Sequence, residues 1–223
     1  MGGQDARGPN SQERVRVPTA TTICSAAHAV GDILKLPLVA VRIDGASMLL
    51  GFELDLVEHD RRARLGLGAL ASTELLHGLW LLPGGVPVPL SALPPMKAER
   101  LRAAAHSVVE TDCGFERLYS PPGMVRSVAF VGRNAERLVQ RSIRFTPIFQ
   151  RVAVVMDGGR PLSTRVECTA REWGIGIVEV NSGAARCALP AGPAETGMPS
   201  VYRWWMAELA YQSWLYENAQ LVS

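Results

Sequence analysis

The chain has 223 residues, which is enough for one large domain or two small ones, and its content of 48% hydrophobic and 20% charged residues is typical of a globular protein. No apolar run reaches the roughly 18 residues of a membrane span, and no secretory signal pattern opens the chain. The cysteines have long, unpatterned spacings, which predicts reduced thiols and a cytoplasmic location. They are Cys24, Cys113, Cys168 and Cys187.

The small net charge of +2 hides one strongly basic block. Residues 1–116 sum to −2 and residues 172–223 to −3. Residues 117–171 sum to +7, because they contain ten arginines, no lysine and three acidic residues. A local excess of this kind indicates an anionic partner.

The first part of the chain predicts a mixture of helix and strand. Residues 1–18 are polar and lack apolar periodicity, which predicts a disordered tail. Apolar residues at helical spacing predict a helix over Thr19–Leu36, which Pro37 ends. Strands are expected at Leu38–Ile43 and Met48–Val57, whereas Leu65–Trp80 fits either helix or strand.

A Pro- and Gly-rich run, Pro83–Pro95, predicts a boundary between a smaller α+β section, residues 19–90, and an α/β domain, residues 96–223. Continuous apolar strands between helices in the second section predict an α/β fold with a mixed central sheet flanked by helices. The expected elements are a helix at Lys97–Val109, a hairpin of Phe115–Tyr119 with Met124–Val131, a helix at Asn134–Phe145, a strand at Arg151–Met156, a helix at Leu162–Trp173, a strand at Ile177–Val180, a loop at Ser182–Pro199 and a C-terminal aromatic helix at Val201–Ala219.

Residues 97–180 resemble the restriction-endonuclease-like PD-(D/E)XK superfamily in this order of elements and in the sequence W-G-I-G-I-V-E-V at Trp173–Val180. The resemblance implies a hairpin with an acid on its first strand and an acid-x-Lys on its second, which together hold a divalent cation. Here the second strand reads M-V-R-S-V-A-F-V-G-R and has neither a carboxylate nor a lysine, and the nearest earlier acids are Asp112 and Glu116. The resemblance therefore implies a related core whose nuclease chemistry is lost.

Four arginines fall on one face of the helix expected after residue 133. Their spacing of i, i+4, i+8 and i+11 aligns the guanidinium groups, which bind phosphates bidentately at any physiological pH. This stripe predicts contact with a nucleic-acid backbone, and the alternative is a solvated amphipathic face in an Arg-rich chain. The predicted nucleic-acid-binding residues are Arg126, Arg133, Arg137, Arg141 and Arg144, with Arg151, Arg160 and Arg165 as possible additions.

Acidic residues at the end of the second strand suggest a second kind of site. Glu53 and Asp55, with Glu58 and Asp60 beyond them, could place carboxylates on one strand face as Mg²⁺ requires. Ordinary alternation on a strand with one solvated face gives the same pattern.

Cysteine and histidine residues offer little support for a metal or a nucleophile. The pairs Cys24/His28 and His106/Cys113 have spacings seen in zinc sites, but buried structural side chains give the same spacings and no C-x-x-C is present. Cys168 is expected in the middle of a helix, away from the electropositive position that activates a thiolate. No metal site is therefore predicted, and phosphate-loop and nucleophile-elbow motifs are absent from the sequence.

The C-terminal helix is unusually aromatic, and its rings spread over more than one helical face. A helix docked on a single core buries one stripe, so the other rings need a second cover, for which we expect a homo-oligomer or a protein partner. Packing on the domain's own core is the alternative. The predicted interface residues are Trp204, Trp205 and Trp214.

Together these patterns predict a nucleic-acid-associated, non-catalytic protein in a DNA-processing, defence or regulatory assembly. One alternative is a protein–protein scaffold or oligomerisation subunit that uses the aromatic helix. Another is a metal-dependent nuclease with displaced active-site acids. Of these hypotheses, only this one requires a cofactor, which would be Mg²⁺. No membrane partner is expected.

Overall fold

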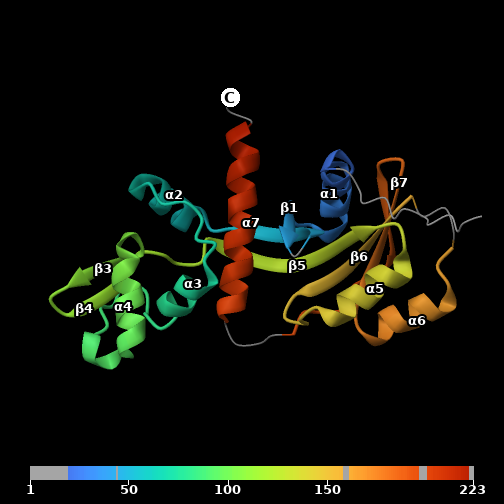
Figure 1. The fold of residues 1–223 in the computed structure, drawn as a ribbon. Helices are drawn as coiled ribbons and strands as arrows, with labels where there is room; N and C mark the ends of the chain where they lie inside the picture. Colours follow the sequence, from blue (N-terminus) through green and yellow to red (C-terminus); the bar gives the residue numbers. More distant parts are fainter. Residues whose placement is uncertain (1–19, 44, 158–160, 196–199, 221–223) are drawn as a thin grey trace, which may run out of the picture.

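The computed structural model describes residues 20–43, 45–157, 161–195 and 200–220 (Figure 1). The tail predicted at residues 1–18 lies outside these ranges. The strands are β1 (Leu38–Ile43), β2 (Ala46–Leu54), β3 (Val108–Thr111), β4 (Gly114–Arg117), β5 (Gly123–Gly132), β6 (Gln150–Met156), β7 (Gly176–Asn181) and β8 (Ala184–Leu189). The helices are α1 (Ala20–Leu34), α2 (Leu56–Leu65), α3 (Thr73–Leu79), α4 (Pro95–Ala103), α5 (Ala135–Arg144), α6 (Thr164–Glu172) and α7 (Val201–Gln220).

Six strands form a mixed sheet in the order β1-β2-β5-β6-β7-β8. The three strands β1, β2 and β5 are antiparallel, β5, β6 and β7 are parallel, and β8 returns antiparallel to β7. Helices α5 and α6 connect the parallel strands, as parallel pairing requires. The predicted fold class, α/β with a mixed central sheet flanked by helices, is confirmed.

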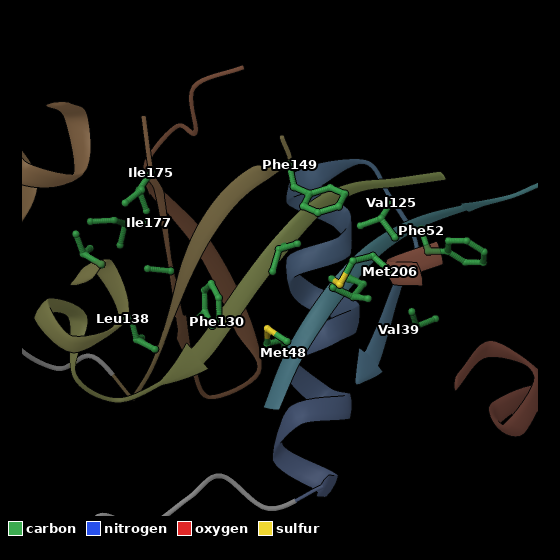
Figure 2. Packing of buried hydrophobic residues seen from close by; sticks show 14 of the residues in the cluster. Val39, Met48, Phe52, Val125, Phe130, Leu138, Phe149, Ile175, Ile177 and Met206 are labelled. Carbon is green, nitrogen blue, oxygen red and sulfur yellow. The ribbon is translucent and has the colours of Figure 1, made fainter. Parts of the chain in front are cut away.

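The sheet is covered on both faces, so most residues of its central strands are apolar. On β6, Val152 and Val154 face α1, while Ala153 and Val155 face the layer of α5, α6 and α7. Figure 2 shows part of this second cluster, which includes Phe130 of β5 and Leu138 of α5. Side chains that alternate between two covered faces explain why the strand sequence R-V-A-V-V-M lacks a polar side.

Residues 55–122 form a lobe between β2 and β5, which lies to the left of α7 in Figure 1. It contains α2, α3, α4 and the separate sheet of β3 and β4, packed around its own apolar cluster. The chain returns to the sheet at Gly123 (φ +155°), where a Cβ would lie 2.2 Å from the carbonyl oxygen of Glu53. Only glycine fits this close approach of two strands. The sheet therefore takes β1 and β2 from residues 19–90 and its other strands from residues 96–223.

Three local predictions for the part of the chain after residue 96 are wrong. Residues 115–119 do not pair with residues 124–131, because β4 pairs with β3 across a tight turn and β5 pairs with β2 and β6. The helix expected to run to Val109 ends at Ala103. The expected loop at Ser182–Pro199 contains β8, which a turn with positive φ at Ser182 and Gly183 joins to β7. Two positive φ values are the signature of a two-residue hairpin turn.

None of the helices in the described ranges combines the length and the hydropathy that crossing a membrane requires.

Candidate functional site

Helix α5 presents its apolar side to the sheet and its basic side outward. The Asn134 side chain accepts a hydrogen bond from the Arg137 amide at 3.0 Å, which caps the first turn. Leu138, Val139 and Ser142 are buried against the sheet. Because these positions share one face, the residues between them are turned to solvent.

The structure places the four arginines predicted on this helix at the surface, at Arg133, Arg137, Arg141 and Arg144. An open groove of about 880 Å³ follows the exposed face of α5. Its lining residues within the described ranges are Asn134, Glu136, Arg137, Gln140, Arg141 and Arg144. Glu136 is the one acidic residue in this set, so the groove is basic as well as polar.

Three of these arginines have no carboxylate partner among the residues that the structure describes: Arg137, Arg141 and Arg144. The Arg141 guanidinium carbon also lies 5.3 Å from the centre of the Phe130 ring, a cation–π contact that holds the side chain against the protein. Arg133 differs, because it pairs with Asp157 at 3.1 Å in an exposed ion pair. We refer to Arg137, Arg141 and Arg144 as the α5 arginine triad.

Two other arginines of the predicted set are held by the protein itself. Arg126 lies on β5 and donates from Nε to Glu53 on β2 at 2.9 Å. Arg151 donates to the carbonyl oxygens of Trp173 and Ser142, which fixes α5 to the turn after α6. Glu53 thus offsets the charge of Arg126, whereas Arg151 keeps its charge but is held by backbone carbonyl oxygens. The candidate Arg160 lies outside the described residues.

The acids predicted as one strand face do not converge. Strand β2 ends at Leu54 and α2 begins at Leu56, so the alternation expected through Val57 is wrong. Asp55 caps α2 by accepting from the amides of Val57 and Glu58, at 3.0 and 3.1 Å. Within the described ranges, no three His, Cys, Asp or Glu side chains gather where they could hold a metal ion. The Cys24 side chain lies outside the described residues.

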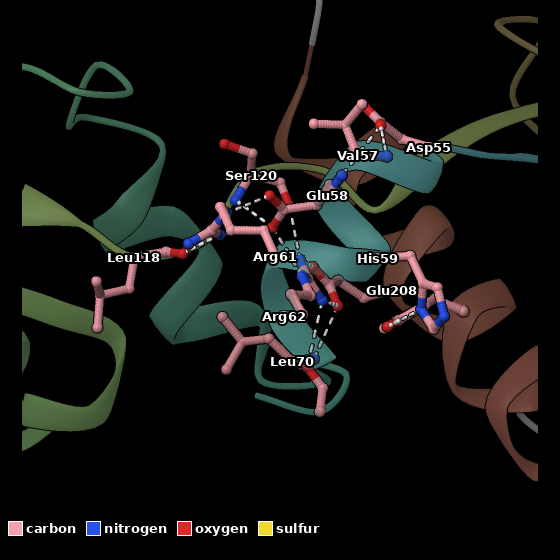
Figure 3. A network of polar contacts seen from close by, with 12 residues as sticks. Asp55, Val57, Glu58, His59, Arg61, Arg62, Leu70, Leu118, Ser120 and Glu208 are labelled. Carbon is pink, nitrogen blue, oxygen red and sulfur yellow. Dashed lines mark hydrogen bonds and ion pairs between the residues drawn. The ribbon is translucent and has the colours of Figure 1, made fainter. Parts of the chain in front are cut away.

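A buried ion network joins the lobe to α7 (Figure 3). Arg62 of α2 is 0% exposed and pairs with Glu58 at 2.8 Å and with Glu208 of α7 at 2.7 Å. Glu208 is equally buried and also accepts hydrogen bonds from the Trp204 indole and from the Leu70 amide, each at 2.8 Å. Both oxygens of its carboxylate therefore accept hydrogen bonds.

The same network holds the end of the lobe. Arg62 donates to the Ser120 carbonyl at 2.6 Å, Arg61 donates to the Leu118 carbonyl, and Glu58 accepts from the Ser120 amide at 3.1 Å. The Arg62 guanidinium also lies 4.7 Å from the centre of the Tyr119 ring. The spacing E-x-x-R-R on α2 was visible in the sequence, but the partner on α7 lies 146 residues beyond Arg62 and carries no local signal.

Acid should weaken this network through Glu58. Burial opposes ionisation of Glu58, but hydrogen bonds from Arg61, Arg62 and the Ser120 amide outweigh that effect and lower the pKa of the carboxyl. Such a group stabilises the fold fully above its unfolded-state pKa, about 4.3, and loses that contribution as the pH falls through its lower folded-state pKa. We expect the difference in unfolding free energy between wild type and Glu58→Gln to be largest at neutral pH and to shrink between about pH 5 and pH 3.

Urea denaturation at several pH values measures this difference. The matched control is Asp60→Asn, which removes an exposed carboxylate from the same helix. A Glu58→Gln difference that stays constant down to pH 3 would show that the carboxyl has the same pKa in the folded and unfolded chain.

The lobe packs against aromatic side chains of α7 that the sheet does not bury. Trp204 is 1% exposed inside the lobe cluster, so it offers no surface to a partner. Trp205 is half-buried between the lobe cluster and the sheet cluster. Trp214 is stacked on Tyr211 with ring centres 6.1 Å apart, and His59 of α2 meets its edge. The chain's own lobe thus covers rings for which a partner was expected.

The geometry leaves two distinct features, a basic helix face at the surface and a fully satisfied ion network inside. Of these two features, only the basic helix face has charged groups that could still bind a partner. Comparison of the chain with protein-family models, with curated proteins and with solved structures gives no match.

Proposed function

We propose that this protein binds the phosphate backbone of a nucleic acid through the α5 arginine triad and does not cleave it. The observation that carries the proposal is the exposure of three guanidinium groups on one face, with no carboxylate partner in the described structure. Uncompensated arginines retain their full capacity for charge-assisted hydrogen bonds, whereas Arg133 and Arg126 are already paired.

The spacing of the triad suits a nucleic-acid strand. A helix rises about 1.5 Å per residue, so the seven steps from Arg137 to Arg144 cover about 10 Å. One strand of duplex DNA carries a phosphate about every 3.4 Å along the axis, so about three phosphates lie within that length. Asn134 and Gln140 line the same groove and can donate from their amide groups. Contacts of this type fix position and carry no base sequence information.

The restriction-endonuclease-like relationship remains a proposal, supported by the parallel strands β5, β6 and β7 with α5 and α6 between them. In that scheme β5 would carry the acid-x-Lys, but it has Arg126 and no carboxylate. The nearest acid across the strand pair is Glu53, which Arg126 already binds. These residues support backbone binding without metal-dependent hydrolysis.

Salt dependence tests the proposal. Three phosphate contacts predict that the Kd for a duplex rises about 40-fold between about 50 and 200 mM salt, and about 20-fold for a single strand. Fluorescence anisotropy of a short labelled duplex, and of one of its strands, measures both slopes. The comparison also identifies the preferred form.

Two results would contradict the proposal. A Kd independent of salt would exclude phosphate contacts. Cleavage of the same labelled duplex when Mg²⁺ is added would favour the nuclease alternative, and its loss in Glu53→Ala would locate the acids responsible.

A further inference from the structure

A pocket of about 450 Å³ lies where the lobe, the start of β5 and the start of α7 meet. The segments that bound it are far apart in the sequence, and no motif marks it. A volume of this size lies within the range of small-ligand sites in proteins. We refer to it as the lobe–sheet pocket, and its principal lining residues are Trp80, Met124, Arg126, Ile148, Arg203 and Trp204.

One side of the lobe–sheet pocket is suited to an anion. The Arg203 guanidinium is anchored by the carbonyl oxygens of Ile148 and Glu195, at 3.0 and 3.1 Å. Its Nε is buried and has no hydrogen-bond partner among the described residues. The two carbonyl acceptors of the guanidinium are neutral, so Arg203 keeps its positive charge, which favours an anion beside it.

The start of α7 adds a second attraction for negative charge. Ser200 caps this helix by accepting from the Arg203 amide at 3.2 Å, and both residues line the pocket. The helix is 20 residues long, and the N-terminus of such a helix carries partial positive charge. Arg126 also lines the pocket, where its ion pair with Glu53 offsets its charge, and Glu195 is the acidic residue of the same lining.

The other side of the lobe–sheet pocket is apolar and aromatic. The rings of Trp80 and Trp204 have centres 6.2 Å apart and are tilted by 57°. Trp80 is only half-buried, so part of its ring is open to the pocket, and Met124 and Ile148 extend the apolar lining. An indole surface of this kind accepts a flat aromatic ring by stacking.

We propose that the lobe–sheet pocket binds a small ligand in which a planar ring is joined to an anionic group, of about the size of a mononucleotide. The anion lies at Arg203 and the start of α7, and the ring lies against Trp80. A phosphate or a carboxylate provides the same acceptor chemistry, so a mononucleotide and an aromatic carboxylic acid are two sources of one ligand type. The site is separate from the α5 arginine triad, which shares no lining residue with it.

Isothermal titration calorimetry of the full chain tests the proposal with four probes. They are adenosine 5′-monophosphate, adenosine, inorganic phosphate and 1-naphthoate. We expect adenosine 5′-monophosphate or 1-naphthoate to bind saturably, and adenosine and phosphate to bind at least about tenfold more weakly, because each lacks one half of the recognised structure. The tighter of the two anionic rings identifies the source.

Two variants with matched controls locate the binding. Trp80→Leu should weaken the preferred probe by about tenfold through loss of stacking, whereas Trp173→Leu removes an exposed indole elsewhere and should not. Arg203→Gln should weaken the same probe by about tenfold or more, whereas Arg171→Gln on α6 should not. Circular dichroism and thermal melting check that each variant is folded.

Clear outcomes would overturn the proposal. Absence of binding by both anionic rings up to about 10 mM would exclude the site. Binding that both pocket variants leave unchanged would place it elsewhere, and adenosine binding as tightly as its phosphate would exclude the anionic half. Arg137→Glu/Arg141→Glu should leave the small-ligand Kd unchanged, so failure here is distinguishable from failure of the nucleic-acid proposal.

Discussion

Replacement of Glu208 by alanine is expected to lower the free energy of unfolding by about 3–5 kcal/mol, because it removes one partner from a buried ion network. Arg62 is fully buried and would keep only Glu58 as a counter-charge. The Trp204 indole and the Leu70 amide would also lose their acceptor. Each unsatisfied buried donor adds its own desolvation cost. Urea denaturation followed by circular dichroism measures the change.

The matched control is Glu53→Ala, which removes one partner of the exposed pair between Glu53 and Arg126. Both side chains are about half exposed, so this pair should contribute under about 1 kcal/mol. A Glu208→Ala loss as small as that of Glu53→Ala would show that water reaches the network and that the lobe is not fixed to α7 through it.

The double substitution Arg137→Glu/Arg141→Glu is expected to weaken binding to a labelled duplex at least about 100-fold at low salt. It removes two of three phosphate contacts and places two repelling charges on the same helix face. Both side chains are exposed, so unfolding free energy should change by less than about 1 kcal/mol, with loss of the Arg141 contact to Phe130 as the main cause. Anisotropy gives the Kd, and thermal melting checks the fold.

A control with the same change in net charge separates local contact from overall repulsion. Arg64→Glu/Arg100→Glu alters two exposed arginines of the lobe, on α2 and α4. This variant should weaken binding by only a few-fold through long-range charge, which salt screens. Equal losses in the two double variants would mean that the α5 arginine triad does not touch the phosphates.

The pattern of apolar residues in the sequence was enough to predict the helices and strands whose own periodicity is clear. The strand Gln150–Met156 was evident from an unbroken apolar run, because a strand buried on both faces has no polar side. The helix Ala135–Arg144 was evident from its apolar residues at helical spacing, and the same periodicity placed Arg137, Arg141 and Arg144 on the outer face. The face of a helix that is not buried is exposed wherever the helix docks, so these positions could be found without the fold.

Only the tertiary structure decided which distant segments meet. Pairing of β2 with β5 spans a 68-residue lobe, residues 55–122, and nothing in either strand specifies that partner. In the sequence, Glu208 does not differ from other helical glutamates, and only the fold places Arg62 of α2 beside it. The lobe–sheet pocket likewise forms only where four separated segments converge. Periodicity reports how one segment divides its faces between core and solvent. Which surface each face packs against depends on the packing of the whole chain. The local sequence therefore does not predict it.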